Sequence, residues 1–576
     1  MSISDAIVQT FRRFDADGNG IIDRGDLLRV LRLLDETIFS EAMVDQMLGL
    51  MDKNGDGRIE YAEFVEWVMT SGSTAEPRKE FRMNPRVFLP EHFNVAIEDR
   101  YRVDALCIGE GGYGKVFKAW DSRSGRQVAV KQVAKKDSDP ATTLTFYREI
   151  NFMKELDHPN ICKLLETFEI GSNIFFVMEC CDGGEVFDRI IATGSISEAL
   201  TADIIRQTVA AIKYTHSRRI CHRDLKPENL VFLTREPNDN RVKLIDWGLA
   251  ITIGDGTVMT TPVGSSTYMA PEVMTASDAR PYNEKCDFWS IGVLAYVMIC
   301  GRPPFWGDMK TMLANARAER YDMINPPWPS VSGHAKDFIC RLIKCNPDSR
   351  MGIEDCSRHA WLNANTFVED PEAQRCVLQN MKRFVNTGLF TSMCITAVAR
   401  QLDHKRLHSI HNVFRSIDKN SDGYLSIGEV QEGFKALYGE HSEEFLEIDR
   451  TFKGLDIDGS GIIDYTEFCA AALGEHTAVQ EEAIWAAFKT FDIDNSNTIS
   501  IAELKKILEN ADVRRVWTPA VCEQVAAKML YQHDMDGDGA ISYNEWLSVM
   551  RKIYYDNMPP EPNAAMLSAD VEGALA

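Results

Sequence analysis

Apolar residues recur at helical spacing on both sides of several short acidic segments of the chain. The stretches VQTFRRF and EFVEWVM, near the N-terminus, predict amphipathic helices that flank two such segments. WSIGVLAYVMIC, residues 289–300, is apolar throughout but shorter than the about 20 residues that cross a bilayer, so it predicts a buried helix. Residues 376–402 carry Leu, Met, Phe and Val at helical spacing, together with Lys382, Arg383 and Arg400. This pattern predicts a basic amphipathic helix that a calmodulin-like groove could bind, although a plain packing helix would show the same pattern.

The acidic segments share one register of twelve residues. A calcium-binding loop takes oxygen ligands from positions 1, 3, 5, 7, 9 and 12 and places Gly at position 6. The loops that begin at Asp52, Asp418 and Asp534 match this template in full, and those that begin at Asp15, Asp456 and Asp492 match it with substitutions. An apolar residue stands at position 8 of every loop, which predicts short strands that join the loops into three pairs. Any single loop could be a solvated turn, but a shared register across all of them favours metal binding.

The candidate calcium ligands follow from the template, in which position 7 binds through its backbone carbonyl. They are Asp15, Asp17, Asn19, Asp23 and Asp26; Asp52, Asn54, Asp56, Arg58 and Glu63; Asp418, Asn420, Asp422, Tyr424 and Glu429; Asp456, Asp458, Ser460 and Glu467; Asp492, Asp494, Ser496, Thr498 and Glu503; and Asp534, Asp536, Asp538, Ala540 and Glu545.

Three loops depart from the template. Asp26 is one methylene shorter than the usual Glu at position 12, so we expect the first loop to bind calcium weakly or to accept magnesium. Ser460 and Ser496 replace a charged oxygen with a neutral one, and Asn497 replaces Gly at a position where Asn tolerates left-handed backbone. The loops and their flanking helices resemble the EF-hand family, arranged as an N-terminal pair and a calmodulin-like group of four.

Composition narrows the class of protein. The 576 residues carry a formal net charge of -23, which argues against a nucleic-acid partner because phosphate binding needs a basic surface. The 14 cysteines form no CxxC pair, so free thiols in a reducing compartment are expected. The N-terminus lacks a signal-peptide pattern, and Ser2 stands where N-myristoylation needs Gly. We therefore expect a soluble, cytoplasmic, monomeric protein without a membrane span.

A second set of motifs fills residues 101–362. IGEGGYGKVFKAW has the GxGxxGxV order of a glycine-rich loop, and VAVK, HRDLKPEN, LIDWGLA and MAPEV follow it in the order of the protein-kinase template. Each motif alone could arise by chance or from packing, but the ordered set favours phosphoryl transfer. The candidate catalytic residues are Lys131, Glu149, Asp224, Lys226, Asn229 and Asp246, and the candidate nucleotide-binding residues are Gly109, Gly111, Gly114, Val116, Ala129, Lys131, Met178, Glu179, Cys181 and Glu185.

This segment resembles the Ser/Thr protein kinases, whose small β-rich lobe sits over a larger helical lobe with ATP between them. The resemblance implies that Lys131 pairs with Glu149 and bridges ATP phosphates, and that Asp224 accepts the proton of the substrate hydroxyl. It also implies that Asn229 and Asp246 hold magnesium.

Further positions take roles from the same resemblance. Met178 corresponds to the gatekeeper before the hinge, Asp287 to the aspartate that braces the catalytic loop, and Glu272 to the partner of Arg350. Two acidic positions, Glu185 and Glu228, match those that select a basic residue upstream of the phosphoacceptor, although bare surface carboxylates would be unremarkable.

Two positions depart from the kinase pattern. Trp247 replaces the usual Phe after the metal-binding Asp, and Ser265 stands where the family usually has Thr. Thr257, Thr260 and Thr261 lie in the activation segment.

The order of kinase, basic helix and four EF-hands resembles the calcium-dependent protein kinases of plants, algae and protists. The expected fold class is α+β, a bilobal kinase fold flanked by all-α EF-hand domains. The expected boundaries are an EF-hand pair at 1–72, a linker at 73–100, the kinase at 101–362, a junction helix at 376–403, a calmodulin-like domain at 404–552 and a disordered tail at 553–576.

This resemblance implies a calcium-activated Ser/Thr kinase that uses ATP with Mg²⁺ and Ca²⁺ and acts on protein substrates near upstream basic residues. The junction would restrain the kinase at low calcium and move when calcium opens the EF-hand pairs. The main alternative is a calcium-responsive pseudokinase scaffold, and a calcium buffer is a weaker one. The N-terminal pair is additional to the usual pattern and could be a second calcium input, a clamp on the kinase or a recruitment site.

Overall fold

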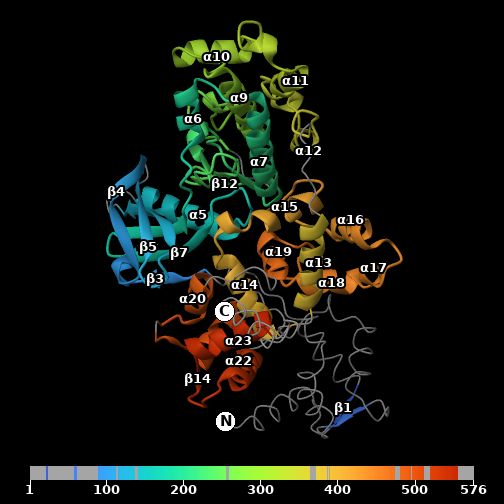
Figure 1. Ribbon diagram of the computed structural model, residues 1–576. Helices are drawn as coiled ribbons and strands as arrows, with labels where there is room; N and C mark the ends of the chain where they lie inside the picture. Colours follow the sequence, from blue (N-terminus) through green and yellow to red (C-terminus); the bar gives the residue numbers. More distant parts are fainter. Residues whose placement is uncertain are drawn as a thin grey trace, which may run out of the picture.

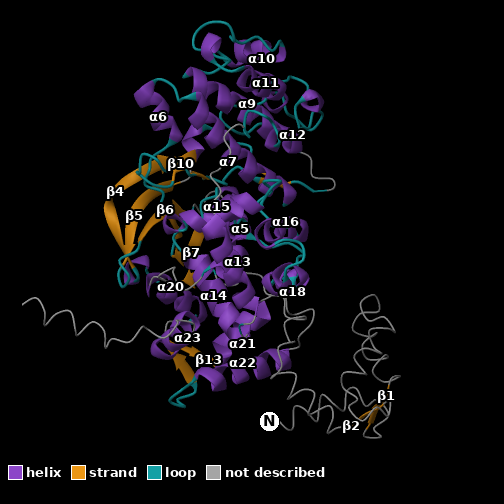
Figure 2. Ribbon diagram, turned by 45° about the vertical axis from the view of Figure 1, so that its right-hand side comes forward, coloured by secondary structure: helices purple, strands orange, loops and turns teal. Residues whose placement is uncertain are grey.

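The computed structural model describes two kinase lobes and a helical EF-hand region (Figures 1 and 2). The described residues are 21–23, 58–60, 89–111, 114–135, 140–254, 259–363, 371–385, 387, 389–473, 481–494, 496–510 and 519–555. In Figure 1 the large lobe lies at the top, the sheet of the small lobe at the left, and the EF-hand helices below and to the right.

The small lobe is a six-stranded sheet covered by one helix, α5 (Pro140–Glu155). Its strands β7 and β8 are buried along most of their length, as expected for strands covered on both faces of the sheet. The strand order is β3-β7-β8-β6-β5-β4, and the strands are β3 (Glu91–Phe93), β4 (Tyr101–Gly111), β5 (Gly114–Asp121), β6 (Gln127–Ala134), β7 (Leu164–Ile170) and β8 (Asn173–Glu179).

The small lobe begins before the expected kinase boundary at residue 101. Leu89 is buried, and β3 pairs in parallel with β7. Residues 89–100 therefore belong to the kinase rather than to a linker. The sequence did not predict the strand β3, because three residues are too few to show an alternating pattern of apolar and polar side chains.

The large lobe is helical and surrounds one apolar helix. α9 (Lys285–Cys300) is buried along nearly its whole length, which confirms the buried helix expected for residues 289–300. No described helix is long and apolar enough to cross a bilayer. The other elements of the lobe are α6 (Val186–Thr193), α7 (Glu198–Ser217), α8 (Pro271–Met274), α10 (Met309–Arg317), α11 (Gly333–Leu342) and α12 (Ile353–Ser357), with the short strands β9 (Ile220–Cys221), β10 (Leu230–Phe232), β11 (Val242–Leu244) and β12 (Ile251–Thr252).

The junction is two helices, α13 (Pro371–Val385) and α14 (Leu389–Gln401), and not the single helix expected for 376–403. The sequence between them is Asn-Thr-Gly, which favours helix ends over helix interiors. Both helices share one buried apolar cluster with the EF-hand helices, so they are bound inside the module rather than exposed.

The EF-hand module contains two pairs of loops. Leu425 and Ile463 form a β-bridge between the first two loops, and β13 pairs with β14 between the last two, which confirms the pairing expected from position 8. The module's elements are α15 (His408–Ile417), α16 (Ile427–Tyr438), α17 (Glu443–Leu446), α18 (Ile448–Leu455), α19 (Tyr465–Ala472), α20 (Glu481–Phe491), β13 (Thr498–Ser500), α21 (Ile501–Asn510), α22 (Pro519–His533), β14 (Ala540–Ser542) and α23 (Tyr543–Tyr555).

Near the N-terminus, β1 (Ile21–Asp23) pairs with β2 (Arg58–Glu60), and Ile22 lies opposite Ile59. This confirms the pairing of the first two loops. Their remaining candidate ligands, and the expected tail from residue 556, lie outside the described residues.

Candidate functional site

The cleft between the kinase lobes brings together three predicted catalytic side chains. Lys131 Nζ on β6 lies 2.6 Å from Glu149 Oε1 on α5 and 3.8 Å from Asp246 Oδ1. Burial raises the pKa of Glu149, and the Lys131 charge opposes that effect. Asp246 has a positive φ of 66°, an uncommon backbone conformation for a residue other than Gly. The small lobe, α5 and the loop after β11 are therefore set together around one cation.

Asp224 lies at the centre of a hydrogen-bond network in the catalytic loop. Lys226 Nζ donates to Asp224 Oδ2 at 2.6 Å, and the Ser265 backbone N–H and hydroxyl donate to Asp224 Oδ1 at 2.9 and 2.8 Å. Asn229 Nδ2 donates to the Asp224 carbonyl oxygen at 2.8 Å. Burial would raise the pKa of Asp224, but the Lys226 and Ser265 hydrogen bonds outweigh it and lower that pKa. The carboxylate is therefore ionised and oriented, with Ser265 filling the place expected for a Thr.

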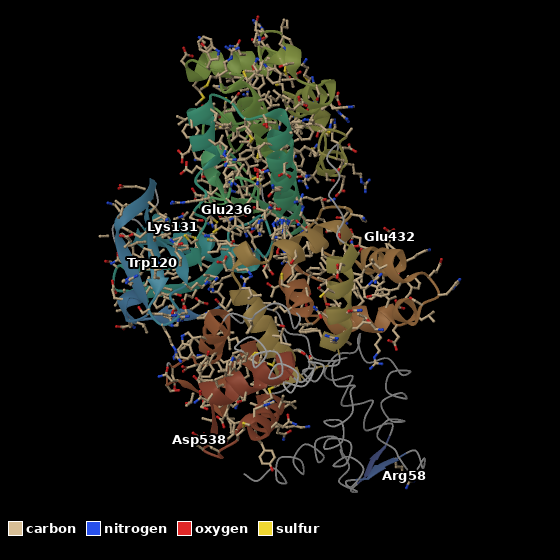
Figure 3. All side chains as sticks on the ribbon, viewed as in Figure 1. Arg58, Trp120, Lys131, Glu236, Glu432 and Asp538 are labelled. Carbon is tan, nitrogen blue, oxygen red and sulfur yellow. The ribbon has the colours of Figure 1, made fainter. Side chains whose placement is uncertain are left out.

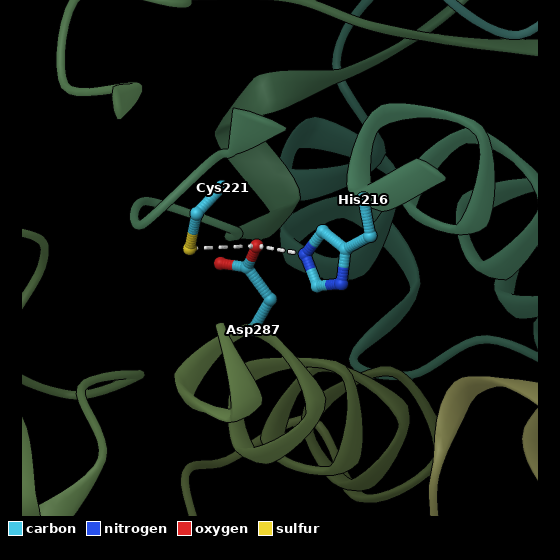
Figure 4. A group of neighbouring side chains, drawn as sticks. All are labelled: His216, Cys221 and Asp287. Carbon is cyan, nitrogen blue, oxygen red and sulfur yellow. Dashed lines mark hydrogen bonds and ion pairs between the residues drawn. The ribbon is translucent and has the colours of Figure 1, made fainter. Parts of the chain in front are cut away.

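Asp287, at the start of α9, braces the catalytic loop from below (Figure 4). Its carboxylate accepts hydrogen bonds from the backbone N–H groups of His222 and Arg223, at 3.0 and 2.9 Å, and lies 2.8 Å from the His216 ring. These donors outweigh burial and lower the pKa of Asp287 to about 2. Asp287, His216 and Cys221 are close enough for a metal ion, but the same carboxylate already holds the loop backbone. The expected bracing role fits this geometry.

The activation segment is anchored at its far end and packed at its start. Arg350 donates to both carboxylate oxygens of Glu272, at 2.5 and 2.7 Å, which confirms that expected pair. Trp247 is buried, and its ring meets the His222 ring edge-on at 4.7 Å between centroids. The larger aromatic residue is therefore accommodated in this arrangement. Thr257 lies outside the described residues.

The predicted nucleotide-binding residues line the sheet side of the cleft. Ala129 on β6 pairs with Met178 on β8, which places this candidate nucleotide-binding residue beside the expected gatekeeper. Gly114 has a φ of 153°, and a Cβ there would lie 2.4 Å from the Gln132 carbonyl oxygen, so only Gly fits. The strand register also sets Gly109 opposite Val116 and Gly111 opposite Gly114.

The side chain of Glu179 is used within the protein. Its Oε1 accepts from the Lys163 backbone N–H at 2.8 Å and lies 2.7 Å from Lys243 Nζ. Any nucleotide contact from this hinge residue must therefore come from its backbone. Cys181, two residues later, is partly exposed.

Carboxylates gather at the mouth of the cleft near the start of α6. Burial raises the pKa of Glu185, and the charges of Asp188 and Glu228 raise it further. Repulsion among these groups would be relieved by a basic side chain bound there.

Three calcium loops have their carboxylates collected in the structure. In each of three loops, three carboxylates have ligand atoms within 4.8 Å of one another. The three groups are Asp456, Asp458 and Glu467; Asp492, Asp494 and Glu503; and Asp534, Asp536 and Glu545. All-oxygen donors of this kind fit calcium. Asn497 has a φ of 66°, which confirms that Asn adopts the left-handed turn here.

The loop Asp418–Glu429 instead lies against the kinase. Lys213 Nζ on α7 donates to the Asn420 carbonyl oxygen at 2.8 Å, and the Tyr424 ring lies 5.0 Å from the Tyr214 ring. A Cβ on Gly423 would lie 2.4 Å from His158 Cδ2. A candidate calcium ligand set is thus built into the kinase surface.

The turn after α14 carries functional contacts that the sequence did not reveal. Arg126, between β5 and β6, donates to the Gln401 carbonyl oxygen at 2.5 Å, and Lys405 Nζ lies 2.8 Å from Asp182 Oδ1 beside the hinge. Arg241 Nη1 donates to the His404 carbonyl oxygen at 2.8 Å. This turn therefore touches the small lobe, the hinge region and the large lobe. The charged residues themselves were visible in the sequence, but not their partners.

Comparison with known proteins agrees with this geometry. Residues 103–362 match the protein kinase domain, and residues 4–69, 408–473 and 481–551 match the EF-hand domain pair. Calcium-dependent protein kinase 5 of Plasmodium falciparum is 35% identical over 80% of this chain and 79% of its own length. Calcium-dependent protein kinase 3 of Plasmodium berghei is 35% identical over 82% of this chain and 84% of its own length. Calcium-dependent protein kinase 17 of Arabidopsis thaliana is 32% identical over 78% of this chain and 84% of its own length. With its kinase lobes, its helical junction and its paired calcium loops, this chain belongs to the family of calcium-dependent protein kinases.

Proposed function

We propose that this protein transfers the γ-phosphate of ATP to Ser or Thr of protein substrates with upstream basic residues, and that its junction restrains this activity at low calcium. The observation that carries the proposal is the combination of an assembled cleft and a calcium loop in direct contact with the same kinase domain. The Lys131–Glu149 pair and the oriented Asp224 support chemistry, and the Lys213 contact with Asn420 supports calcium control.

Each catalytic side chain has a task that its surroundings fit. Lys131, fixed by Glu149, orients the phosphates of bound ATP. Asp224, held ionised, accepts the proton of the substrate hydroxyl, and Lys226 lies beside it to stabilise charge on the transferred group. Asn229 and Asp246 offer oxygen atoms for magnesium, which would neutralise phosphate charge when bound.

The position of the junction supports the proposed restraint and its release. Phe390 on α14 is buried among the rings of Phe491, His533 and Trp546 in the second EF-hand pair. The apolar face of a helix held there is covered by the EF-hand module. If calcium is removed and the pairs close, the groove no longer covers this face, and the released helix becomes free to bind the kinase.

The main test measures phosphate transfer to a basic Ser peptide at fixed magnesium while free calcium is titrated. Activity should rise with calcium, and Asp224→Asn should lower kcat by about a hundredfold or more because it removes the proton acceptor. Flat activity would leave a kinase without the proposed switch. ATP binding without transfer at any calcium concentration would favour the scaffold.

Substrate preference is tested separately with peptide libraries. Glu185→Gln and Glu228→Gln should weaken the preference for an upstream Arg or Lys. Glu432→Gln is the matched control, because Glu432 is exposed on α16, away from the cleft (Figure 3). Equal preference in the parent protein and both cleft variants would reject the acidic recognition site.

A further inference from the structure

In the sequence, the strand β3 lies between the segment that matches an EF-hand pair and the catalytic residues. The matched pair ends at residue 69, and β3 begins at Glu91 as the outer strand of the small-lobe sheet. The Thr167 backbone N–H donates to the Pro90 carbonyl oxygen at 3.1 Å, and the Asn94 N–H donates to the Glu169 carbonyl oxygen at 2.8 Å. The strand is thus hydrogen-bonded to β7 at both of its ends.

His92 anchors this strand on one face of the sheet. Its ring stacks on Phe168 at 4.4 Å, and its Nε2 lies 2.9 Å from Glu166 Oε2. The same Glu166 accepts from Arg100 at 2.7 Å and from the Tyr101 hydroxyl. Burial would raise the pKa of Glu166, but Arg100 and His92 outweigh it and lower that pKa. The anchor is therefore a buried charged network, which is costly to break on one side only.

On the side of the strand opposite His92, Glu91 and Leu89 contact the helix α5. Successive side chains of a strand point to opposite faces. Glu91 Oε1 lies 2.6 Å from Lys154 Nζ on α5, and Leu89 joins the buried cluster that includes Phe146 and Ile150 of the same helix. A small cavity of about 130 Å³ lies between β3, α5 and β7.

Helix α5 also carries the residue that fixes the catalytic lysine. Glu149 lies five residues, or about one and a half turns, before Lys154, and its carboxylate holds Lys131. Tyr147, on the same helix, donates to Glu169 Oε2 on β7 at 3.0 Å. Contacts from β3 and β7 thus reach α5 on both sides of Glu149.

We propose that residues 89–94 form a positioning strand that sets α5, and through it the Lys131–Glu149 pair, for phosphoryl transfer. The inference rests on the proposed kinase function.

The test uses full-length variants and measures kcat, the KM for ATP and ATP affinity, with each rate referred to the concentration of ATP-binding protein. His92→Ala should lower kcat by about fivefold, equivalent to about 1 kcal/mol, because α5 loses its anchored neighbour. Phe93→Ala is the matched control on the same strand, since its side chain is 61% exposed, and it should stay within about twofold of the parent.

A charge reversal separates positioning from folding. Glu91→Lys should lower kcat by about threefold, and the combined Glu91→Lys and Lys154→Glu should restore it, because the swapped pair remakes the contact. Parental kcat in both His92→Ala and Glu91→Lys would overturn the inference, as would a swap that fails to recover a lost rate. A parent that transfers no phosphate would reject the proposed function instead. ATP affinity can be measured without phosphate transfer. It should still weaken in His92→Ala and in Glu91→Lys, and it should recover in the combined Glu91→Lys and Lys154→Glu variant.

Discussion

Two calcium loops of this protein have equally complete ligand templates but different surroundings. The loop Asp418–Glu429 is packed against α7, whereas a Cβ on Gly539, in the loop Asp534–Glu545, would meet no atom within 4 Å. In the second loop the carboxylates of Asp534, Asp536 and Glu545 come within 4.8 Å of one another, whereas position 3 of the first loop is Asn420, a neutral amide. Burial, reinforced by Asp422, raises the pKa of Asp418 to about 7. The template determines which atoms can bind calcium, while packing against the kinase influences the free energy of calcium binding.

The largest expected difference between the two loops comes from the glycine at position 6. Gly423 and Gly539 have φ of 79° and 87°, so Ala at either position is strained by about 1–2 kcal/mol. Only Gly423→Ala also places a methyl group against His158, whose ring is packed on Tyr214. We expect Gly423→Ala to lower calcium-stimulated activity at least about tenfold through loss of docking, and Gly539→Ala to lower it less than about threefold.

Limited proteolysis of the full-length protein in saturating calcium tests this loss of docking directly. Gly423→Ala should expose the junction to cleavage, and Gly539→Ala should leave it protected. Equal protection in both variants would show that contact with the kinase does not distinguish the loops.

The residue at position 7 separates docking from metal binding. This position supplies a backbone carbonyl, so removing its side chain leaves the ligand in place. Tyr424→Ala removes the ring that stacks on Tyr214 and lies 5.4 Å from the Arg218 guanidinium. We expect the calcium concentration for half-maximal activity to rise about fivefold, because about 1 kcal/mol of aromatic stacking is lost.

Thr498→Ala is the control at the same position of the loop Asp492–Glu503. It should leave calcium activation unchanged, as measured in the same titration. A shift of equal size in Thr498→Ala would place the effect within the loop rather than at the kinase.

The docked face should also be sensitive to acid. Burial, together with the charge of Lys243, lowers the pKa of His158 to about 3. An unfolded histidine takes up a proton near pH 6.5 and the folded one does not, so stability is lost as the pH falls below about 6.5. The loss for this residue is about 1.4 kcal/mol between pH 7.5 and 5.5.

Thermal unfolding in calcium at these two pH values measures the effect. His158→Gln should reduce the difference in Tm, and His334→Gln, at an exposed position of α11, should not. A pH dependence that His158→Gln leaves untouched would assign it to other groups.

The smallest expected effect concerns the second EF-hand pair. Its contact with the small lobe includes Arg123, whose guanidinium lies 3.2 Å from the Trp485 ring centroid. Arg123→Ala should raise the calcium concentration for half-maximal activity by no more than about threefold, because such a contact is worth about 0.5 kcal/mol at an exposed site. Arg102→Ala, which removes a similar contact within the small lobe, is the control. No difference between the two variants would leave the first pair as the principal docking surface.

Local motifs made the catalytic residues and the loop pairs predictable, because the residues that define each chemical role lie within a few positions of one another in the sequence. The Lys131–Glu149 pair, the Glu272–Arg350 pair and the strand partners at position 8 all follow from such motifs. Contacts between distant segments were not predictable. Gly423 is explained by its turn alone, so nothing in the sequence showed that His158 also requires it. β3 is too short for a pattern, and the break in the junction depends on how two helices fit one module.

One further consequence lies in how the helices after the calcium loops begin. Ser426 and Glu429 form a reciprocal capping box, and Asp464 and Glu467 form another, so position 9 is the N-cap and position 12 the third residue of each exiting helix. The glutamate that can bind the ion thus also closes the end of a helix. Gln can keep that cap without the charge, so a Glu-to-Gln change isolates metal affinity, whereas Ala removes metal affinity and helix start together. At position 12 of the first loop the sequence has Asp26, whose side chain is one methylene shorter than that of Glu.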